Sequence, residues 1–339
     1  MASKFKSHTH KASSTQRRVN PINHFNVIIR KQVSGAQQDL SYWNCKLKLS
    51  TSCPNSDVTF FLYTSGRTKR RFHIDLKNKQ PLHYSGWNPN KLNVIIIHGF
   101  NGAENQNHMT IIRNAYLKRG DFNVFTVDWM PLTRYPCYLS SLSNMRLVSL
   151  CAAQFYSHLT YSGASAFNIH CVGHSLGAHL CGMISNHLTL RQHKIIGLDP
   201  ARPLVSMFSS DEFRLTRDDA NVVEIIHTNI GMYGDTPRTG DVDFCVNGGR
   251  LQPVCSRESN IIRQGRCSHL TSTCYFAESL VKNRVHFLGI PCTDSCDTLL
   301  LPKNSKQIVF VPMGLHTPER TKGTFCVQYK ISRKTCPFE

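Results

Sequence analysis

Short apolar runs alternate with longer amphipathic stretches along the chain from about residue 42 onward. Runs of this length are typical of buried strands, and stretches with a period near 3.6 residues are typical of helices. The apolar runs predict strands at Val58–Tyr63, Val94–Ile97, Val124–Val127, Phe167–Val172, Ile195–Leu198 and Val222–Ile226. The amphipathic stretches predict helices at Met109–Lys118, Asn144–Leu159 and Leu176–Leu188. This alternation predicts an α/β fold, a mainly parallel central sheet with helices on both faces.

The two ends of the chain depart from this pattern. Before Asp39 there is no acidic residue, and we expect residues 1–40 to form a basic, disordered extension. After about residue 285 only β-like pieces remain, at Ile308–Val311 and Phe325–Ile331. About 50 residues are few for a second domain, so we expect one domain over residues 41–339.

Composition narrows the class of protein. Hydrophobic residues make up 40% of the 339, enough for a sizeable core, and the apolar runs are strand-sized, which excludes a membrane-spanning protein. The 40 Lys and Arg against 21 Asp and Glu give a net charge of +19. Such a charge is compatible with nucleic acid or an anionic lipid surface, but the chain has no nucleic-acid recognition module. Fourteen cysteines are many for a reducing compartment, yet no secretory signal is visible in the chain. Either the cysteines are free or metal-bound, or an export signal is missing from this sequence.

Gly173-His174-Ser175-Leu176-Gly177 matches G-x-S-x-G, the nucleophile elbow of serine hydrolases. A predicted strand precedes it and a predicted helix follows. Glycines beside the serine allow the sharp turn that exposes its hydroxyl. The alternative is an ordinary strand–helix turn with a capping serine.

A nucleophilic serine needs a histidine to take its proton and a carboxylate to orient that histidine. Asp199 directly follows the strand Ile195–Leu198, although an aspartate before a proline is also a common turn former. Four histidines lie downstream, and the residues alone leave the choice open: His227, His269, His286 and His316. His227 ends a strand, which favours a hydrogen-bonding role in the core or in a turn. His269 is expected in a loop held by cysteines.

Acyl transfer also needs donors for the oxyanion. One is the backbone N–H of Leu176, directly after the serine. The segment His98-Gly99-Phe100 follows an earlier strand, and the N–H of Phe100 is the natural second donor.

Six motifs together resemble the pancreatic lipase family of α/β-hydrolases, in matching order and at similar spacing from about residue 53 to 290. They are Ile96-Ile97-His98-Gly99-Phe100, Val127-Asp128-Trp129, Gly173-His174-Ser175-Leu176-Gly177-Ala178-His179, Gly197-Leu198-Asp199-Pro200-Ala201, Ile226-His227-Thr228 and Cys267-Ser268-His269. Within the family, the chain is most similar to insect phospholipases A1, including wasp-venom enzymes. The resemblance implies a catalytic triad of Ser175, Asp199 and His269.

The resemblance also bears on the substrate. The family's lid corresponds to the segment between Cys255 and Cys267, only 11 residues long (256–266), and the loop from Thr228 to Val242 also looks shortened. Short loops in this family accompany phospholipid hydrolysis. The chain ends 70 residues after His269, so we expect neither the C-terminal β-sandwich nor colipase as a partner.

Disulfides and metals follow from the same resemblance. It implies disulfides Cys255–Cys267 and Cys53–Cys137, with Cys274–Cys292 as a further candidate. Cys171 and Cys181 are expected to be buried free thiols. The family's calcium-binding stretch falls on Asp211, Arg214, Thr216 and Asp219, where Thr216 replaces a carboxylate, so we expect no metal and no cofactor.

The sequence therefore predicts a secreted serine carboxyl-ester hydrolase for glycerolipids. The favoured activity is that of a phospholipase A1, which releases the sn-1 fatty acid at a membrane or lipoprotein surface. Ile261 and Ile262 lie in the lid with four arginines around them, which are Arg250, Arg257, Arg263 and Arg266. This surface favours docking on anionic lipid, and the alternative is a solvated basic face. The alternative functions are a triacylglycerol or galactolipid lipase and a non-catalytic lipid-binding protein related to yolk proteins.

Overall fold

The computed structural model describes residues 44–64, 70–78, 82–205, 210–236, 238–281, 287–301 and 308–336. The predicted extension over residues 1–40 lies outside these ranges. The named strands of the described part form a single 11-stranded sheet in the order β10-β9-β11-β8-β7-β6-β5-β3-β4-β1-β2. The strands are β1 (Thr59–Thr64), β2 (Arg70–Ile74), β3 (Leu92–Ile97), β4 (Phe122–Asp128), β5 (Ile169–His174), β6 (Gln192–Leu198), β7 (Ala220–His227), β8 (Val242–Val246), β9 (Leu288–Pro291), β10 (Val311–Pro312) and β11 (Gly323–Val327).

The centre of this sheet is parallel and its two edges are antiparallel. Parallel pairing runs from β4 through β3, β5, β6, β7 and β8 to β11. Antiparallel β1 and β2 complete one edge, and β9 and β10 complete the other. The C-terminal β-like pieces are therefore part of the same sheet. All six predicted strands occur, because strands buried on both faces read as continuous apolar runs.

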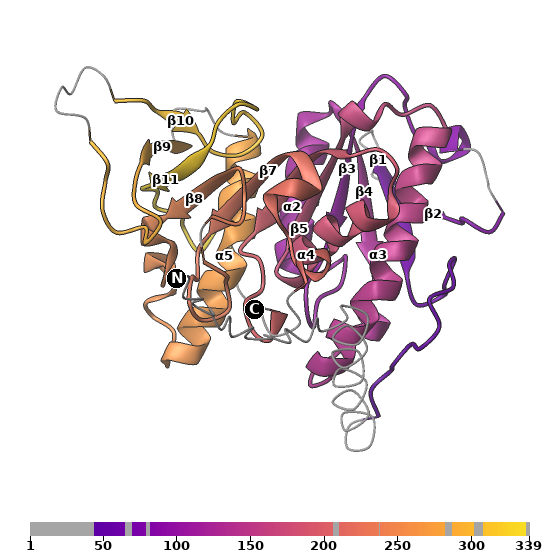
Figure 1. Cartoon of the computed structure of the whole chain (residues 1–339), viewed down its shortest axis with the longest axis horizontal. Coiled ribbons are helices and arrows are strands. Elements are labelled where there is room, and N and C mark those ends of the chain that lie inside the picture. Colours follow the sequence, from indigo (N-terminus) through magenta and orange to yellow (C-terminus); the bar gives the residue numbers. More distant parts are fainter. Residues whose placement is uncertain are drawn as a thin grey trace, which may run out of the picture.

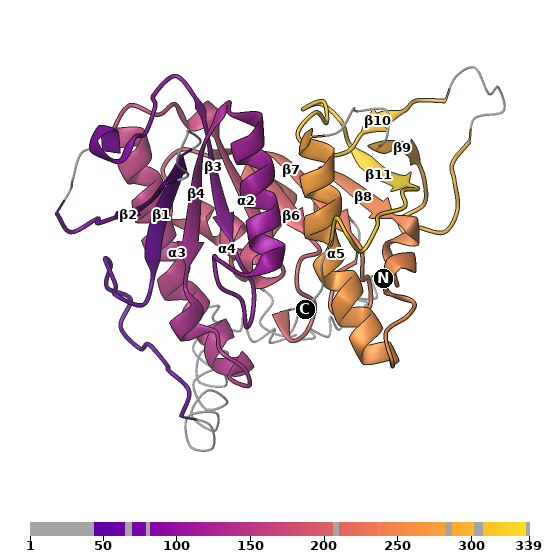
Figure 2. The same ribbon diagram turned by 180° about the vertical axis from the view of Figure 1, so that it is seen from behind.

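Helices cover both faces of the sheet, which confirms the predicted α/β architecture (Figures 1 and 2). On β3, Ile95 and Ile97 belong to the core shared with α3 (Tyr138–Tyr161) and α4 (Leu176–Ile184). The intervening Val94 and Ile96 belong to the core shared with α2 (Asn107–Arg119) and α5 (Ile261–Val281). Successive side chains of a strand point to opposite faces, so one strand supplies both cores.

Within the described residues, none of the helices combines the length and the apolarity needed to cross a membrane.

Helix α5 corrects one expectation about the site. His269 was expected in a loop, but it lies in the third turn of this helix. The sequence around it is rich in Gly, Ser, Thr and Cys, which are weak helix formers. Burial of Tyr275, Phe276 and Leu280 in the core shared with α2 outweighs that low propensity.

The 14 cysteines form seven disulfides, and Cys255 pairs with Cys267. The other expected pairings were wrong. Cys53–Cys137 is replaced by Cys45–Cys137 and Cys53–Cys151, and Cys274–Cys292 by Cys274–Cys336 and Cys292–Cys326. The expected free thiols Cys171 and Cys181 pair with each other, and Cys245 pairs with Cys296.

Cys53 pairs with Cys151 instead of Cys137 because of the path that the N-terminal segment takes along α3. Asn144 of α3 accepts a hydrogen bond from the N–H of Lys48 and donates one to the carbonyl of Lys46. The fourteen steps along α3 from residue 137 to 151 span about 21 Å, which the eight steps from residue 45 to 53 cover as extended chain. Two disulfides therefore attach this segment to the helix at both of its ends.

Candidate active site

Ser175 stands at a sharp turn between β5 and α4, at the carboxyl edge of the parallel strands. Its backbone has φ 57° and ψ −122°, a conformation that costs on the order of 1–3 kcal/mol. The glycines on either side make this turn possible. A Cβ at residue 173 would lie 2.1 Å from the carbonyl oxygen of Gly177, and one at residue 177 would lie 2.2 Å from that of Ile97. Only glycine fits at either position, as the predicted elbow requires.

Asp199 directly follows β6 and is fully buried. Its Oδ2 lies 2.6 Å from Nδ1 of His269. Its Oδ1 accepts the backbone N–H groups of Thr228 (2.8 Å) and Asn229 (3.0 Å). The charged carboxylate is thus fully hydrogen-bonded and fixed in orientation, as a buried carboxylate requires.

The ring of His269 is held beside the elbow by two aromatic neighbours. Its centroid lies 4.6 Å from that of His174, the residue before Ser175, and 5.7 Å from that of Tyr233. Nε2 of His174 also lies 3.2 Å from the carbonyl oxygen of His269. The structure therefore places His269 against Asp199 and beside the elbow that carries Ser175, and the three residues come from three separate elements.

The segment with the expected oxyanion donor lies against the serine. A Cβ on Gly99 would come within 2.6 Å of the Ser175 Cβ, so the backbone next to Phe100 approaches the nucleophile closely. The N–H of Asn101 donates to the Thr133 carbonyl (2.7 Å), which fixes the turn. Leu176 is the first residue of α4, so its N–H is outside the helix's own hydrogen bonds.

Glu104 anchors this segment, and the sequence carried no signal for it. Its side chain is 3% exposed and accepts the hydroxyl of Tyr63 (2.6 Å). Arg71 and Arg113 each form an ion pair with it at 3.1 Å. Burial and this hydrogen bond raise the pKa of Tyr63 to about 12. A buried carboxylate held between two guanidinium groups fixes the loop that begins at His98.

The other histidines lie elsewhere. Nε2 of His227 lies 2.8 Å from Oδ1 of Asp243, and both side chains are buried, which matches the core role expected for His227. His316 follows β10, and His286 lies outside the described residues.

The residues at the family's calcium positions contact one another. Asp211 forms an ion pair with Arg214 at 2.9 Å. Asp219 and Thr216 form a capping box, in which the Thr216 N–H donates to the Asp219 carboxylate at 2.7 Å.

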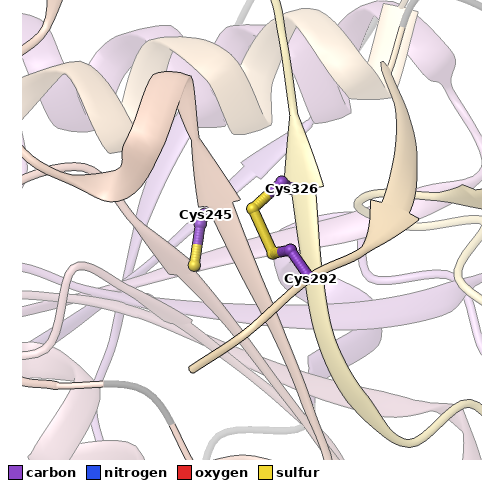
Figure 3. A group of neighbouring side chains, drawn as sticks. All are labelled: Cys245, Cys292 and Cys326. Atoms are coloured by element: carbon purple, nitrogen blue, oxygen red, sulfur yellow. A yellow bond between two sulfur atoms is a disulfide. The ribbon is translucent and has the colours of Figure 1, made fainter. Parts of the chain in front are cut away.

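Three cysteine sulfurs form a group with the geometry of a metal site. The Sγ atoms of Cys245, Cys292 and Cys326 lie within 4.8 Å of one another, where β8 and β11 run side by side (Figure 3). All three belong to disulfides, and a disulfide sulfur is not the thiolate that a metal binds. The group is therefore two adjacent disulfides that tie the edge of the sheet.

Asp219 predicts a pH-dependent stability. Burial raises its pKa to about 6 from 3.8, so the native state binds this proton more tightly than the unfolded state. The tighter proton binding adds up to about 3 kcal/mol to the free energy of unfolding. This contribution is fully present below about pH 4 and is lost as the pH rises to about 6. Asp219→Asn has no carboxyl to titrate at this position. In urea unfolding between pH 4 and pH 6, the stability of wild type should therefore fall relative to that of Asp219→Asn. Asp211→Asn, at an exposed aspartate, is the control, and an Asp219→Asn profile parallel to wild type would contradict the prediction.

The segment predicted to be the lid is short and presents an apolar and basic surface. Residues 256–266 lie between the paired Cys255 and Cys267. Ile261 and Ile262 are 53% and 63% exposed. All four arginines singled out from the sequence are exposed: Arg250, Arg257, Arg263 and Arg266.

Comparisons with known proteins show the family of the chain. A family model described as Lipase matches residues 28–298. The chain is 29% identical over 269 residues to pancreatic triacylglycerol lipase of Myocastor coypus, covering 73% of this chain and 58% of that protein. It is 34% identical over 215 residues to phospholipase A1 of Vespula maculifrons, covering 60% and 69%. It is 33% identical over 221 residues to phospholipase A1 member A of Bos taurus, covering 63% and 47%. The match thus spans little more than half the length of the pancreatic enzyme.

Among solved structures, a thermophilic esterase from Thermogutta terrifontis is 12% identical, with a TM-score of 0.36 over 56% of this chain and 74% of that chain.

Proposed function

The chain belongs to the pancreatic lipase family and has its α/β-hydrolase fold, and on that premise we propose that it is a phospholipase A1. The observation that carries the proposal is the constellation at the carboxyl edge of the sheet. A serine at a nucleophile elbow lies beside a histidine whose Nδ1 is 2.6 Å from a buried carboxylate. This is the arrangement of a serine esterase.

The proposed mechanism assigns a role to each group. Ser175 attacks the ester carbon, and Nε2 of His269 takes the hydroxyl proton. Asp199 accepts the Nδ1–H of His269, which holds the ring in the correct tautomer and stabilises the imidazolium. The backbone N–H groups of Phe100 and Leu176 bind the oxyanion. His269 then protonates the leaving alcohol, and water releases the fatty acid from the acyl-enzyme.

The choice of phospholipid rests on the entrance to the site. The lid is 11 residues long and closed by the disulfide Cys255–Cys267, so it leaves little chain to cover Ser175. Two of the similar proteins are named phospholipase A1, one from Vespula maculifrons and one from Bos taurus. A short lid and these relatives together favour the phospholipid substrate over triacylglycerol.

The test is hydrolysis of phosphatidylcholine that carries different labels at sn-1 and sn-2. We expect release of the sn-1 label only. Faster hydrolysis of triolein or of a galactolipid would overturn the choice of substrate. Absence of hydrolysis, together with no labelling of folded protein by a fluorophosphonate probe, would instead support a non-catalytic lipid-binding protein.

The exposed face of the lid docks on anionic lipid in this proposal. Ile261 and Ile262 enter the interface, and each lid arginine near the surface contributes about 1 kcal/mol. Binding to phosphatidylcholine vesicles in a sedimentation assay should strengthen when phosphatidylglycerol is added and weaken again with salt. Equal binding to neutral and anionic vesicles would contradict this docking.

The disulfides bear on where the chain works. Seven of them among the described residues are typical of proteins that fold in an oxidising compartment. A secreted enzyme that meets phospholipid outside the cell fits this framework.

A further inference from the structure

One face of helix α5 carries the proposed catalytic base, His269, and also residues nearer the start of the helix. Residues 262, 266 and 269 are spaced four and three apart, so Ile262, Arg266 and His269 lie on the same side of the helix. His269 contacts Asp199, which fixes the direction of this face toward the site. Arg266 is exposed on that face, one turn from the histidine.

The positive charge of Arg266 is not neutralised by the described part of the chain, where no carboxylate lies within ion-pairing distance of it. Glu258, the acidic residue of the lid, forms an ion pair with Arg333 at 3.1 Å. Neither α2 nor α5 has an acidic residue in its first turn. The guanidinium group is thus available to an anion from outside the protein.

Helix α5 lies next to α2 on this side of the sheet (Figure 2). The ring of His108, in the first turn of α2, lies 5.3 Å from that of His174. Burial, helped by the charges of His98, His269 and Arg266, lowers the pKa of His108 to about 3. The positive charge of Arg266 therefore acts on His108, whose ring lies beside that of His174, the residue before the nucleophile.

We propose that Arg266 binds the phosphate of the glycerophospholipid whose sn-1 ester Ser175 attacks. This phosphate subsite rests on the proposed function. Residues three apart on a helix have Cβ atoms about 5–6 Å apart, and only the glycerol backbone and its ester oxygens separate the sn-1 carbonyl carbon from the phosphorus. A guanidinium group binds phosphate through paired hydrogen bonds. A triacylglycerol has no anion at this position, so Arg266 selects the phospholipid.

The experiment uses dissolved substrates, so that docking on a lipid surface does not contribute. Wild type and Arg266→Gln are compared on monomeric short-chain phosphatidylcholine and on a dissolved neutral diacylglycerol of short chain length. The ratio of kcat/KM for the phospholipid to kcat/KM for the neutral ester should fall about ten- to hundredfold in Arg266→Gln. Arg266→Lys keeps the charge and should recover part of the ratio. Arg320→Gln, at an exposed arginine beyond β10, is the matched control and should keep the wild-type ratio.

The outcomes separate the two proposals. If wild type hydrolyses both esters and Arg266→Gln leaves the ratio unchanged, the phosphate subsite is wrong and the esterase proposal stands. An equal loss on both esters would also overturn the subsite, since it would show a general defect. A folded wild type that hydrolyses neither ester would overturn the proposed function itself.

Discussion

Ser175→Ala is expected to lower kcat on phosphatidylcholine by about 10⁶-fold, because the acyl-enzyme then has no nucleophile. The expected residual rate comes from substrate binding and the oxyanion donors, which the substitution leaves in place. Alanine removes only the hydroxyl from a residue that is 8% exposed, so the fold should persist. Release of labelled fatty acid, measured with purified protein, checks the result.

A matched control for this variant is Ser157→Ala, at an exposed serine on the outer side of α3. It should keep wild-type activity. Circular dichroism should show the same fold for both variants. Surviving activity above a thousandth of wild type in Ser175→Ala would mean that another group is the nucleophile.

Asp199→Asn is expected to lower kcat by about 10⁴-fold, with a smaller effect on KM. The amide oxygen that this substitution introduces is able to accept the N–H groups of Thr228 and Asn229, as the Asp199 carboxylate does now. The amide NH₂ would then face Nδ1 of His269 and donate to it. The ring would carry its proton on Nε2, the atom that must accept the proton of Ser175.

Steady-state kinetics on the same phospholipid separates kcat from KM for this variant. Asp218→Asn, at an exposed aspartate, is its control and should keep wild-type kinetics. A loss confined to KM would show that Asp199 acts in binding rather than in orienting His269.

Local patterns were enough to predict β3 to β7 of the parallel centre and the elbow, although β8 was missed. Val94–Ile97 and Ile195–Leu198 are apolar because both faces of the sheet are covered, and that cause acts on each strand separately. The elbow is local as a motif, because its residues lie within Gly173 to Gly177 and Gly173 is required by contacts with Gly177 and Ala178. Gly177 is required by the end of β3, which lies far away in the sequence. The residues alone could not identify the proposed base among the four downstream histidines. The resemblance to the lipase family pointed to His269 through the order of the motifs.

Features that depend on distant contacts were missed. The helix around His269 forms because Tyr275, Phe276 and Leu280 pack on α2, although its own residues have low helix propensity. Most disulfide partners were missed for a related reason. The pairing of Cys53 with Cys151 depends on the direction in which the N-terminal segment crosses α3, which no short pattern records. Glu104 was missed because its partners Tyr63, Arg71 and Arg113 come from separate elements.

Helix α5 begins at Ile261, inside the lid, and continues without interruption through His269. The second half of the lid and the proposed base therefore belong to one continuous helix, which the disulfide between Cys267 and Cys255 holds in place. A swing of this half of the lid would unwind the helix or carry the base away from Asp199. We therefore expect the predicted lid to form a fixed border of the proposed site, set when the chain folds, instead of a segment that the substrate must displace.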